Sequence, residues 1–287
     1  MSNFTTNKWL KTWYLSVALI LLGAPNVVQA EAAINTVRVA VATNFVTTLK
    51  ALREDFESFD NGKILISAGS TGKLYAQIRQ GAPYDIFLGA DQQRPQLLEH
   101  YGLIVLNSRF TYASGALVLW RPNGAIPGAA NGDEKPLAQS TQIKQWLAGA
   151  SSIALANPRL APYGHAAQEV LHNLKITFTP SQRQINGENI GQTFSLVATG
   201  NATLGFVAAA QMLEQNQPFA TYLNIPSELH SPILQDAVQL KYGANNHAAA
   251  RFMQYLASLR AQKIIQSAGF LAAEADLSAN LNTNLRP

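Results

Sequence analysis

The sequence predicts an α/β protein in which two doubly wound α/β lobes are joined by two crossover segments. Between Val37 and Gly102, short apolar β-branched runs alternate with amphipathic helical patterns, which is typical of a parallel sheet covered by helices. The alternation breaks at Ala116 and starts again at Ser152, which indicates a second sheet. A late apolar run at residues 233–240 could then return to the first sheet.

Residues 1–30 have the pattern of a secretory signal peptide. Lys8 and Lys11 form a basic start, and residues 15–23 form an apolar run that is too short to span a bilayer. The small residues that end this segment favour cleavage after Ala30, so the mature chain is expected to begin at Glu31. An uncleaved membrane anchor is the alternative. A cleaved leader predicts a protein of the periplasm.

The composition excludes several classes of site and partner. The chain has no cysteine, which rules out disulfides, thiolate metal sites, cysteine nucleophiles and a lipid-anchored cysteine. The net charge is +4, and two of the lysines lie in the expected leader. No run of basic residues is interleaved with aromatic ones, so we expect no nucleic-acid partner.

The first lobe is expected to follow a β-α-β-α-β-α order. The apolar run at 37–42 is nearly continuous, as in a strand buried on both faces. In the helical pattern that follows it, Leu49, Leu52 and Phe56 form one stripe. The expected strands are 37–42, 63–68 and 86–90, and the expected helices are 46–59, 74–80 and 95–101.

The second lobe is expected to span residues 116–232, between two parts of the first lobe at 31–115 and 233–287. A stretch at 122–136, rich in Gly, Asn, Ala and Pro, is expected to be a loop, and the residues after 272 a loose tail. Its expected strands are 116–120, 152–156 and 204–207, and its expected helices are 143–147, 165–174, 189–199 and 208–215. The strand expected at 233–240 and the helix expected at 247–268 belong to the returning part of the first lobe.

Small hydroxyl and amide residues directly follow two of the expected strands. Thr43 and Asn44 come after the strand at 37–42, and Ser70 and Thr71 come after the strand at 63–68. Open α/β sheets bind ligands at the carboxyl ends of their strands, where helix N-termini offer unpaired N–H groups and partial positive charge. The sequence therefore predicts an anion site near these residues.

Other interpretations of the same residues are possible. The segment 70–73, STGK, is not a nucleotide-binding P-loop, because that motif needs Gly where Ser67 stands and Ser or Thr where Leu74 stands. Ser70 and Thr71 could instead cap the helix, and capping is compatible with anion binding. The chain has no GxSxG motif, the signature of an α/β-hydrolase nucleophile.

The motifs of this chain resemble those of the periplasmic molybdate-binding proteins that feed ABC importers, a family of two-lobed substrate-binding proteins. The resemblance covers almost the whole expected mature chain and implies the type II periplasmic binding protein fold. The motifs stand in the family's order and spacing: VAVATNF (39–45), SAGSTGKLYAQI (67–78), GAPYDIFLGAD (81–91), FTYASGALVLW (110–120) and NPRLAPYG (157–164).

In that family, neutral groups on both lobes hold the oxyanion. The resemblance implies that Thr71 donates its hydroxyl, Asn44 its amide and Ile190 its backbone N–H. Many members have a Tyr where this chain has Ala208, and Tyr163 could substitute for that contact. The implied ligand-binding residues are Thr43, Asn44, Ser70, Thr71, Tyr163 and Ile190, and molybdate itself would be held by Thr43, Asn44, Thr71, Tyr163 and Ile190.

The function that the resemblance implies is capture of molybdate, and also tungstate, by a monomeric binding protein that is not an enzyme and needs no cofactor. Its partners would be the importer's membrane permease and ATPase. Molybdate is a dianion that offers only acceptors, so it suits a site made of donors. The matched positions provide no acceptor for the remaining proton of phosphate. A binder of another oxyanion, such as sulfate or a phosphonate, and an exported α/β hydrolase are the alternatives.

Overall fold

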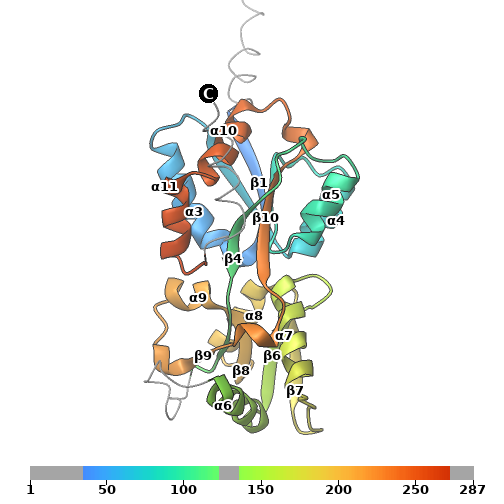
Figure 1. Cartoon of the computed structure of the whole chain (residues 1–287), viewed down its shortest axis with the longest axis vertical. Helices are drawn as coiled ribbons and strands as arrows, with labels where there is room; N and C mark the ends of the chain where they lie inside the picture. The colour runs from blue at the N-terminus through green and yellow to red at the C-terminus, as the bar shows by residue number, and fades with distance from the viewer. Residues whose placement is uncertain (1–34, 123–135, 272–287) are drawn as a thin grey trace, which may run out of the picture.

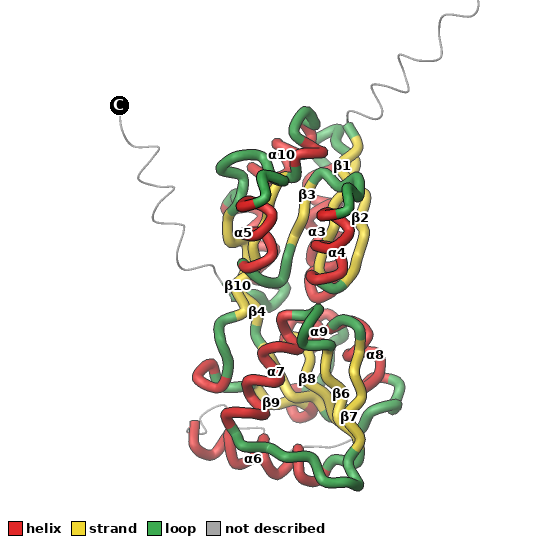
Figure 2. Tube along the Cα trace, turned by 90° about the vertical axis from the view of Figure 1, so that its right-hand side faces the viewer, coloured by secondary structure: helices red, strands yellow, loops and turns green. Residues whose placement is uncertain are grey.

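Two α/β lobes are stacked along the long axis of the molecule (Figure 1). The computed structural model describes residues 35–122 and 136–271. Each lobe contains one five-stranded sheet, and helices cover the sheets (Figure 2). The predicted α/β class with two lobes is therefore confirmed. Within the described ranges, no helix is both long enough and apolar enough to cross a bilayer.

The sheet of the first lobe is mixed, because one of its strands runs antiparallel to its two neighbours. In sheet order its strands are β2 (Lys63–Gly69), β1 (Thr36–Ala42), β3 (Ile86–Leu88), β10 (Ile233–Gln239) and β4 (Phe110–Gly115). Its helices are η1 (Thr43–Phe45), α3 (Val46–Glu57), α4 (Thr71–Arg79), α5 (Gln93–His100), η4 (Lys241–Gly243), α10 (His247–Leu256) and α11 (Leu259–Ser267). The β2-β1-β3 pairs are parallel, and β10 is antiparallel to β3 and β4.

Successive side chains of β1 point to opposite faces of this sheet, as strand geometry requires. Val37, Val39 and Val41 pack in the cluster that contains residues of α3, α10 and α11. Ala40 packs in a second cluster with residues of α4 and α5. Both faces of the sheet are therefore buried, which explains the nearly continuous apolar run in the sequence.

The sheet of the second lobe is also mixed. In sheet order its strands are β7 (Arg183–Gly187), β6 (Ser152–Ala156), β8 (Leu204–Ala208), β5 (Leu117–Trp120) and β9 (Tyr222–Asn224). Its helices are α6 (Pro136–Gly149), α7 (Pro162–Asn173), α8 (Ile190–Ala198), α9 (Ala209–Glu214), η2 (Phe219–Thr221) and η3 (Ser227–Leu229). On one face, Trp120 stacks on Phe194 with ring centroids 4.6 Å apart.

The chain crosses between the lobes twice, and the two crossings lie side by side. The first joins β4 to β5 through Ala116, and the second leads through Pro232 into β10. Ile233, the first residue of β10, pairs with Gly115, the last residue of β4. Figure 1 shows β4 and β10 running together from one lobe toward the other.

Some predicted elements differ from the observed ones. The single helix expected at 247–268 is wrong: α10 ends at Leu256, and Ser258 begins α11 by accepting a hydrogen bond from the Ala261 N–H at 3.3 Å. Strands β4, β7 and β9 were not predicted, and in β7 partly exposed polar residues mask the apolar pattern. The expected leader, most of the loop at 122–136 and the tail after 272 lie outside the described residues.

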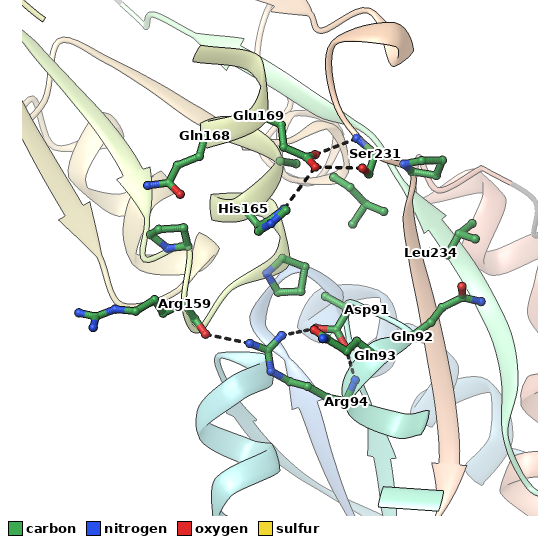
Figure 3. Close-up of a pocket in the computed structure, with 16 residues that line it drawn as sticks. Asp91, Gln92, Gln93, Arg94, Arg159, His165, Gln168, Glu169, Ser231 and Leu234 are labelled. Carbon is green, nitrogen blue, oxygen red and sulfur yellow. Dashed lines mark hydrogen bonds and ion pairs between the residues drawn. The ribbon is translucent and has the colours of Figure 1, made fainter. Parts of the chain in front are cut away.

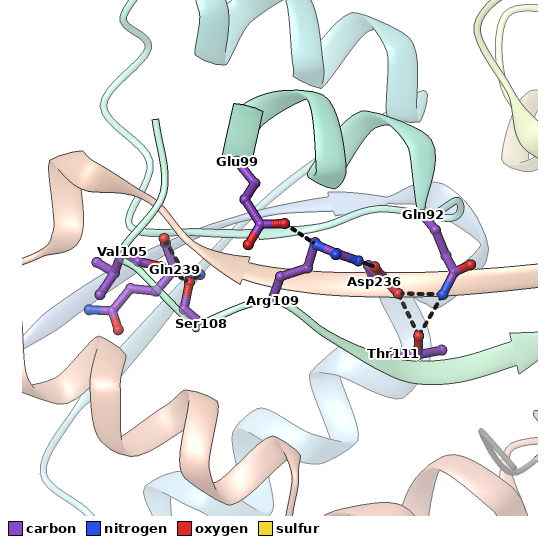
Figure 4. Close-up of polar contacts among 8 residues, drawn as sticks. All are labelled: Gln92, Glu99, Val105, Ser108, Arg109, Thr111, Asp236 and Gln239. Atoms are coloured by element: carbon purple, nitrogen blue, oxygen red, sulfur yellow. Dashed lines mark hydrogen bonds and ion pairs between the residues drawn. The ribbon is translucent and has the colours of Figure 1, made fainter. Parts of the chain in front are cut away.

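A buried carboxylate ties β10 to its neighbours (Figure 4). Asp236 is fully buried and forms an ion pair with Arg109, whose Nη1 lies 2.8 Å from Oδ2. It also accepts hydrogen bonds from Thr111 Oγ1 at 2.7 Å and Gln92 Nε2 at 3.3 Å. Arg109 in turn pairs with Glu99 of α5 at 2.6 Å. The cluster fixes the position of β10 near the crossing between the lobes.

Replacing Arg109 with leucine should lower the free energy of unfolding by about 3 kcal/mol, because Asp236 would remain buried without its cation. Urea unfolding followed by circular dichroism measures this. The matched control is Lys63→Met, which removes the exposed pair with Glu57, and we expect it to cost less than about 1 kcal/mol. Equal losses in the two variants would contradict the assignment of Arg109 as the essential partner of Asp236.

Candidate ligand-binding site

All six predicted site residues line one small chamber between the lobes. Its volume is about 10 Å³, roughly the space for one water molecule. Thr43, Asn44, Ser70 and Thr71 come from the first lobe, and Tyr163 and Ile190 from the second. No charged side chain is among the described residues that line the chamber. The structure thus brings together residues that are far apart in the sequence.

Three helix N-termini converge on the chamber. Thr71 begins α4, Pro162 begins α7 and Ile190 begins α8. Proline is well suited to the first turn because its missing N–H would have no intrahelical acceptor there. Asn189 caps α8 by accepting a hydrogen bond from the Gln192 N–H at 2.9 Å. The unpaired N–H groups and partial positive charges of these ends favour an anion.

Ser70 is the hydroxyl that the structure leaves free in this chamber. Its side chain is buried, and its Oγ has no hydrogen-bond partner within the described residues. Although Ser70 stands at the N-cap position of α4, its side chain makes no capping hydrogen bond, so the capping interpretation is wrong for this residue. A buried hydroxyl without a partner is costly. Its position in the chamber suits it to donate to a ligand.

Thr71 already makes a hydrogen bond within the protein. Its Oγ1 accepts from the backbone N–H of Ala90 at 3.1 Å. This hydrogen bond connects the start of α4 to the segment that directly follows β3. The hydroxyl hydrogen of Thr71 remains available as a donor. Both hydroxyls can therefore donate to a ligand, and Ser70 is the one whose Oγ has no other partner among the described residues.

Tyr163 and Asn44 meet at a residue that the sequence analysis did not single out. Gln235 Nε2 donates to Tyr163 Oη at 3.4 Å, and Asn44 Nδ2 donates to Gln235 Oε1 at 2.9 Å. Burial raises the pKa of the buried Tyr163 hydroxyl far above its usual value, against the opposite effect of hydrogen bonds from Gln235 and Asn44. Tyr163 therefore stays a neutral donor. The polar pair Gln235-Asp236 inside a mainly apolar strand is the signal that points to Gln235.

The Asn44 amide, predicted to donate to the ligand, is partly occupied within the protein. Its Nδ2 is used toward Gln235, and its Oδ1 is buried without a partner in the part of the chain that is described. Asn44 lies in η1, at the start of a helical turn whose first N–H groups lack intrahelical acceptors. The backbone N–H of Asn44 is therefore the better candidate donor.

Ile190 and Ala208 stand on neighbouring segments of the second lobe. Ile190 is the first residue of α8, so its backbone N–H has no intrahelical acceptor. Its carbonyl accepts from Gln211 Nε2 at 3.3 Å, and Gln211 Oε1 accepts from the Ala208 N–H at 3.0 Å. Ala208 itself is absent from the chamber lining, which leaves Tyr163 as the tyrosine there.

The lobes touch each other around the chamber, so this is a closed arrangement. The Gly72 N–H donates to the Leu160 carbonyl at 2.9 Å, and the Gly191 N–H donates to Thr43 Oγ1 at 3.3 Å. Further out, Lys73 pairs with Glu188 at 2.8 Å, and Arg94 Nη2 donates to the Arg159 carbonyl at 2.8 Å. Each of these contacts joins one lobe to the other.

A larger groove of about 570 Å³ lies beside the chamber (Figure 3). Several of its charged groups are already paired: Arg94 binds Asp91, and Glu169 accepts from the backbone N–H and the hydroxyl of Ser231 at 2.8 and 2.9 Å. His165 Nδ1 lies 3.6 Å from Glu169. None of the six predicted site residues lines this groove. The small chamber is therefore the candidate site.

Comparison with known proteins identifies the family. Residues 37–271 match the family model described as bacterial extracellular solute-binding protein. The chain is 38% identical over 257 residues to the molybdate-binding protein ModA of Azotobacter vinelandii, covering 89% of this chain and 97% of the relative. It is 37% identical to ModA of Rhodobacter capsulatus over 84% of this chain and 90% of that relative.

Solved structures agree with this assignment. The periplasmic molybdate-binding protein of Azotobacter vinelandii has a TM-score of 0.71 and 35% identity, over 82% of this chain and 99% of that one. The structure titled tungstate ABC transporter from Geobacter sulfurreducens has a TM-score of 0.61 at 15% identity, over 80% of this chain and 97% of that one, and shows the fold alone. The chain therefore belongs to the bacterial extracellular solute-binding protein family.

Proposed function

We propose that this protein is an extracytoplasmic substrate-binding protein that captures molybdate, and also tungstate, for an ABC importer. The observation that carries the proposal is the chamber itself, in which the unpaired Ser70 hydroxyl faces a space bordered by three helix N-termini and no charged side chain. The relatives at 38% and 37% identity are named as molybdate-binding proteins. Both lines of support point to a binding protein and not to an enzyme.

The donor set suits a tetrahedral dianion. Hydroxyls of Ser70, Thr71 and Tyr163 and backbone N–H groups of Asn44 and Ile190 could each donate to an oxygen that offers only lone pairs. The helix ends balance part of the ligand charge without a salt bridge. Asn44 also provides a buried acceptor, Oδ1, without a partner among the described atoms, and this oxygen could accept the remaining proton of phosphate.

The proposed transport cycle uses the two lobes as a clamp. Lobe 1 would consist of residues 31–115 and 233–287 and lobe 2 of residues 116–232, which agrees with the membership of the two sheets. Residues 1–30 would be a cleaved signal peptide, and the mature monomer would work in the periplasm. Bending at the paired crossings near Gly115 and Ile233 would open the chamber, whose volume of about 10 Å³ must widen to admit an oxyanion of five heavy atoms. The closed form would then be recognised by the permease, which the ATPase drives.

A thermal-shift series with molybdate, tungstate, sulfate and phosphate tests this function. A ligand that binds only the folded protein stabilises it by about 4 kcal/mol when its concentration is a thousand times Kd. We expect large upward shifts of Tm with molybdate and tungstate and small ones with sulfate and phosphate. A large shift with sulfate or phosphate alone, or no shift with any of them, would refute the proposal. Turnover of a generic ester would instead favour the hydrolase alternative.

Molybdate affinity should be nearly independent of pH between about pH 7 and pH 9. The Tyr163 pKa lies above the usual tyrosine value of about 10, because the hydroxyl is buried, so the donor keeps its hydrogen throughout this range. A lowered pKa would have the opposite sign and would cause affinity to fall as the pH rises. Titration calorimetry at several pH values measures the dependence. A steady loss of affinity from pH 7 upward would contradict a neutral tyrosine donor.

A further inference from the structure

A buried glutamine on the last strand joins chamber residues from the two lobes. Gln235 lies on β10, just after the chain has crossed back from lobe 2, and it is fully buried. The pairing of β10 with β4 shifts its register between Gln235 and Asp236. Such a bulge changes the direction of neighbouring side chains. Here Asp236 binds Arg109, whereas Gln235 contacts Asn44 and Tyr163.

The hydrogen bonds of Gln235 define which way its amide faces. Oε1 accepts from Asn44 Nδ2 at 2.9 Å, and it also lies 3.1 Å from Tyr112 Oη, whose single hydrogen is shared with the Gly89 carbonyl at 3.2 Å. Nε2 therefore faces Tyr163 and donates to its Oη at 3.4 Å. Amide orientation is assigned from the surrounding network, here from the Asn44 donor on one side and the Tyr163 oxygen on the other.

This orientation decides what the Tyr163 hydroxyl can do. The Gln235 amide donates to Tyr163, so the phenol oxygen acts as its acceptor. A phenol has one hydrogen to donate, and among the described residues the Tyr163 hydroxyl acts only as an acceptor, from Gln235. Tyr163 lines the chamber, where a ligand oxygen is a suitable acceptor.

We propose that Gln235 is a positioning residue for anion recognition, whose amide holds Asn44 of one lobe and Tyr163 of the other so that the Tyr163 hydroxyl donates into the chamber. The inference rests on the proposed function of the chamber as an oxyanion site. Because Asn44 and Tyr163 come from different lobes, the arrangement is complete only when the lobes are closed. Gln235 thus links ligand recognition to closure. A glutamine that only filled the core would affect folding and leave the ligand contact unchanged.

The test replaces Gln235 with glutamate, which keeps the length of the side chain and the oxygen that accepts from Asn44 and Tyr112. The second carboxylate oxygen takes the place of Nε2, so Tyr163 donates to it and turns its hydrogen away from the ligand. The added negative charge also repels a dianion. In titration calorimetry at about pH 8.5, we expect molybdate affinity to fall at least about tenfold.

Lowering the pH to about 6 should raise the molybdate affinity of Gln235→Glu several-fold. Burial raises the pKa of the new carboxyl, and the protonated group donates to Tyr163 as the amide did. The titratable groups around this position are Tyr112 on β4, Tyr163 on α7, Glu214 on α9 and Asp236 with its partner Arg109. Wild-type affinity should stay flat over the same range. A purely structural role predicts the same loss at both pH values.

The matched control is Gln239→Glu, the same substitution at a buried position of the same strand. Gln239 Nε2 donates to the Gly243 carbonyl at 2.8 Å, away from the chamber. The molybdate affinity of Gln239→Glu should therefore remain within about twofold of wild type. If the wild-type protein binds no molybdate, the proposed function fails. If the wild type binds but Gln235→Glu binds equally well, or loses the same amount at both pH values, this inference is overturned. Should Gln235→Glu not fold, Gln235→Met is titrated instead, and unchanged affinity there overturns the inference.

Discussion

Replacing Ser70 with alanine is expected to weaken molybdate binding by roughly ten- to a hundredfold. A hydrogen bond to a charged group contributes about 1.5–3 kcal/mol, and about 1.4 kcal/mol corresponds to a factor of ten in affinity. The Ser70 hydroxyl has no other hydrogen-bond partner among the described residues, so its loss should not destabilise the ligand-free protein. Titration calorimetry together with Tm measurements separates these two effects.

The neighbouring variant Thr71→Val should lose more stability and less molybdate affinity than Ser70→Ala. It removes the acceptor of the buried Ala90 N–H, which should cost about 1–3 kcal/mol of stability. Its loss of affinity should be smaller than that of Ser70→Ala, although the sequence alone predicts the opposite order. Ser67→Ala, a hydroxyl removed from a half-buried position of β2 outside the chamber, is the control. Unchanged affinity in Ser70→Ala would remove this hydroxyl from the site.

Gly115→Ala should also reduce affinity by roughly tenfold or more, through displacement of Tyr163. A Cβ at Gly115 would lie 2.8 Å from Tyr163 Cζ and 2.9 Å from Gln235 Nε2, with Tyr163 Oη nearer still. These distances are too short for real contacts, so the ring and the crossing strands must move apart. Overpacking of this kind costs about 1–3 kcal/mol of stability. Calorimetry and thermal unfolding measure the two consequences.

A second substitution distinguishes this mechanism from general damage to the hinge. Tyr163→Phe removes the hydroxyl nearest to the new methyl group, so the double variant with Gly115→Ala should regain stability but not affinity. Gly149→Ala is the control, because a Cβ there meets no atom within 4 Å. If Gly115→Ala binds molybdate as tightly as wild type, then close packing of Tyr163 against the crossing is not needed for recognition.

Much of the fold could be predicted because the signals are local. The alternation of β-branched runs with helical stripes gave the order of elements, and both faces of β1 are buried as its continuous apolar run indicates. The division of the helix predicted at 247–268 was missed because apolar periodicity continues across the break. Ser258 followed by a helical pattern was the available signal for a second N-terminus.

The sequence predicts which residues line the chamber but not which hydrogen bonds they make. The carboxyl ends of parallel strands meet at one edge of a sheet, so grouping Thr43, Asn44 and Ser70 required no long-range information. Which neighbouring hydroxyl is free depends on Ala90, which is 19 residues from Thr71. Gln235 is 191 residues from Asn44, and no local pattern reveals that pairing. Sequence reasoning fails here because the hydrogen bonds form across separate elements.

X-ray diffraction at the molybdenum absorption edge, from crystals of the mature protein grown with molybdate, tests the central claim most directly. We predict one strong anomalous peak per molecule in the chamber between the lobes. The oxygens around that peak should lie within hydrogen-bonding distance of Ser70 Oγ, Tyr163 Oη and the Ile190 N–H. A molybdenum peak in the larger groove or on the surface, or no peak in a crystal saturated with molybdate, would contradict the account.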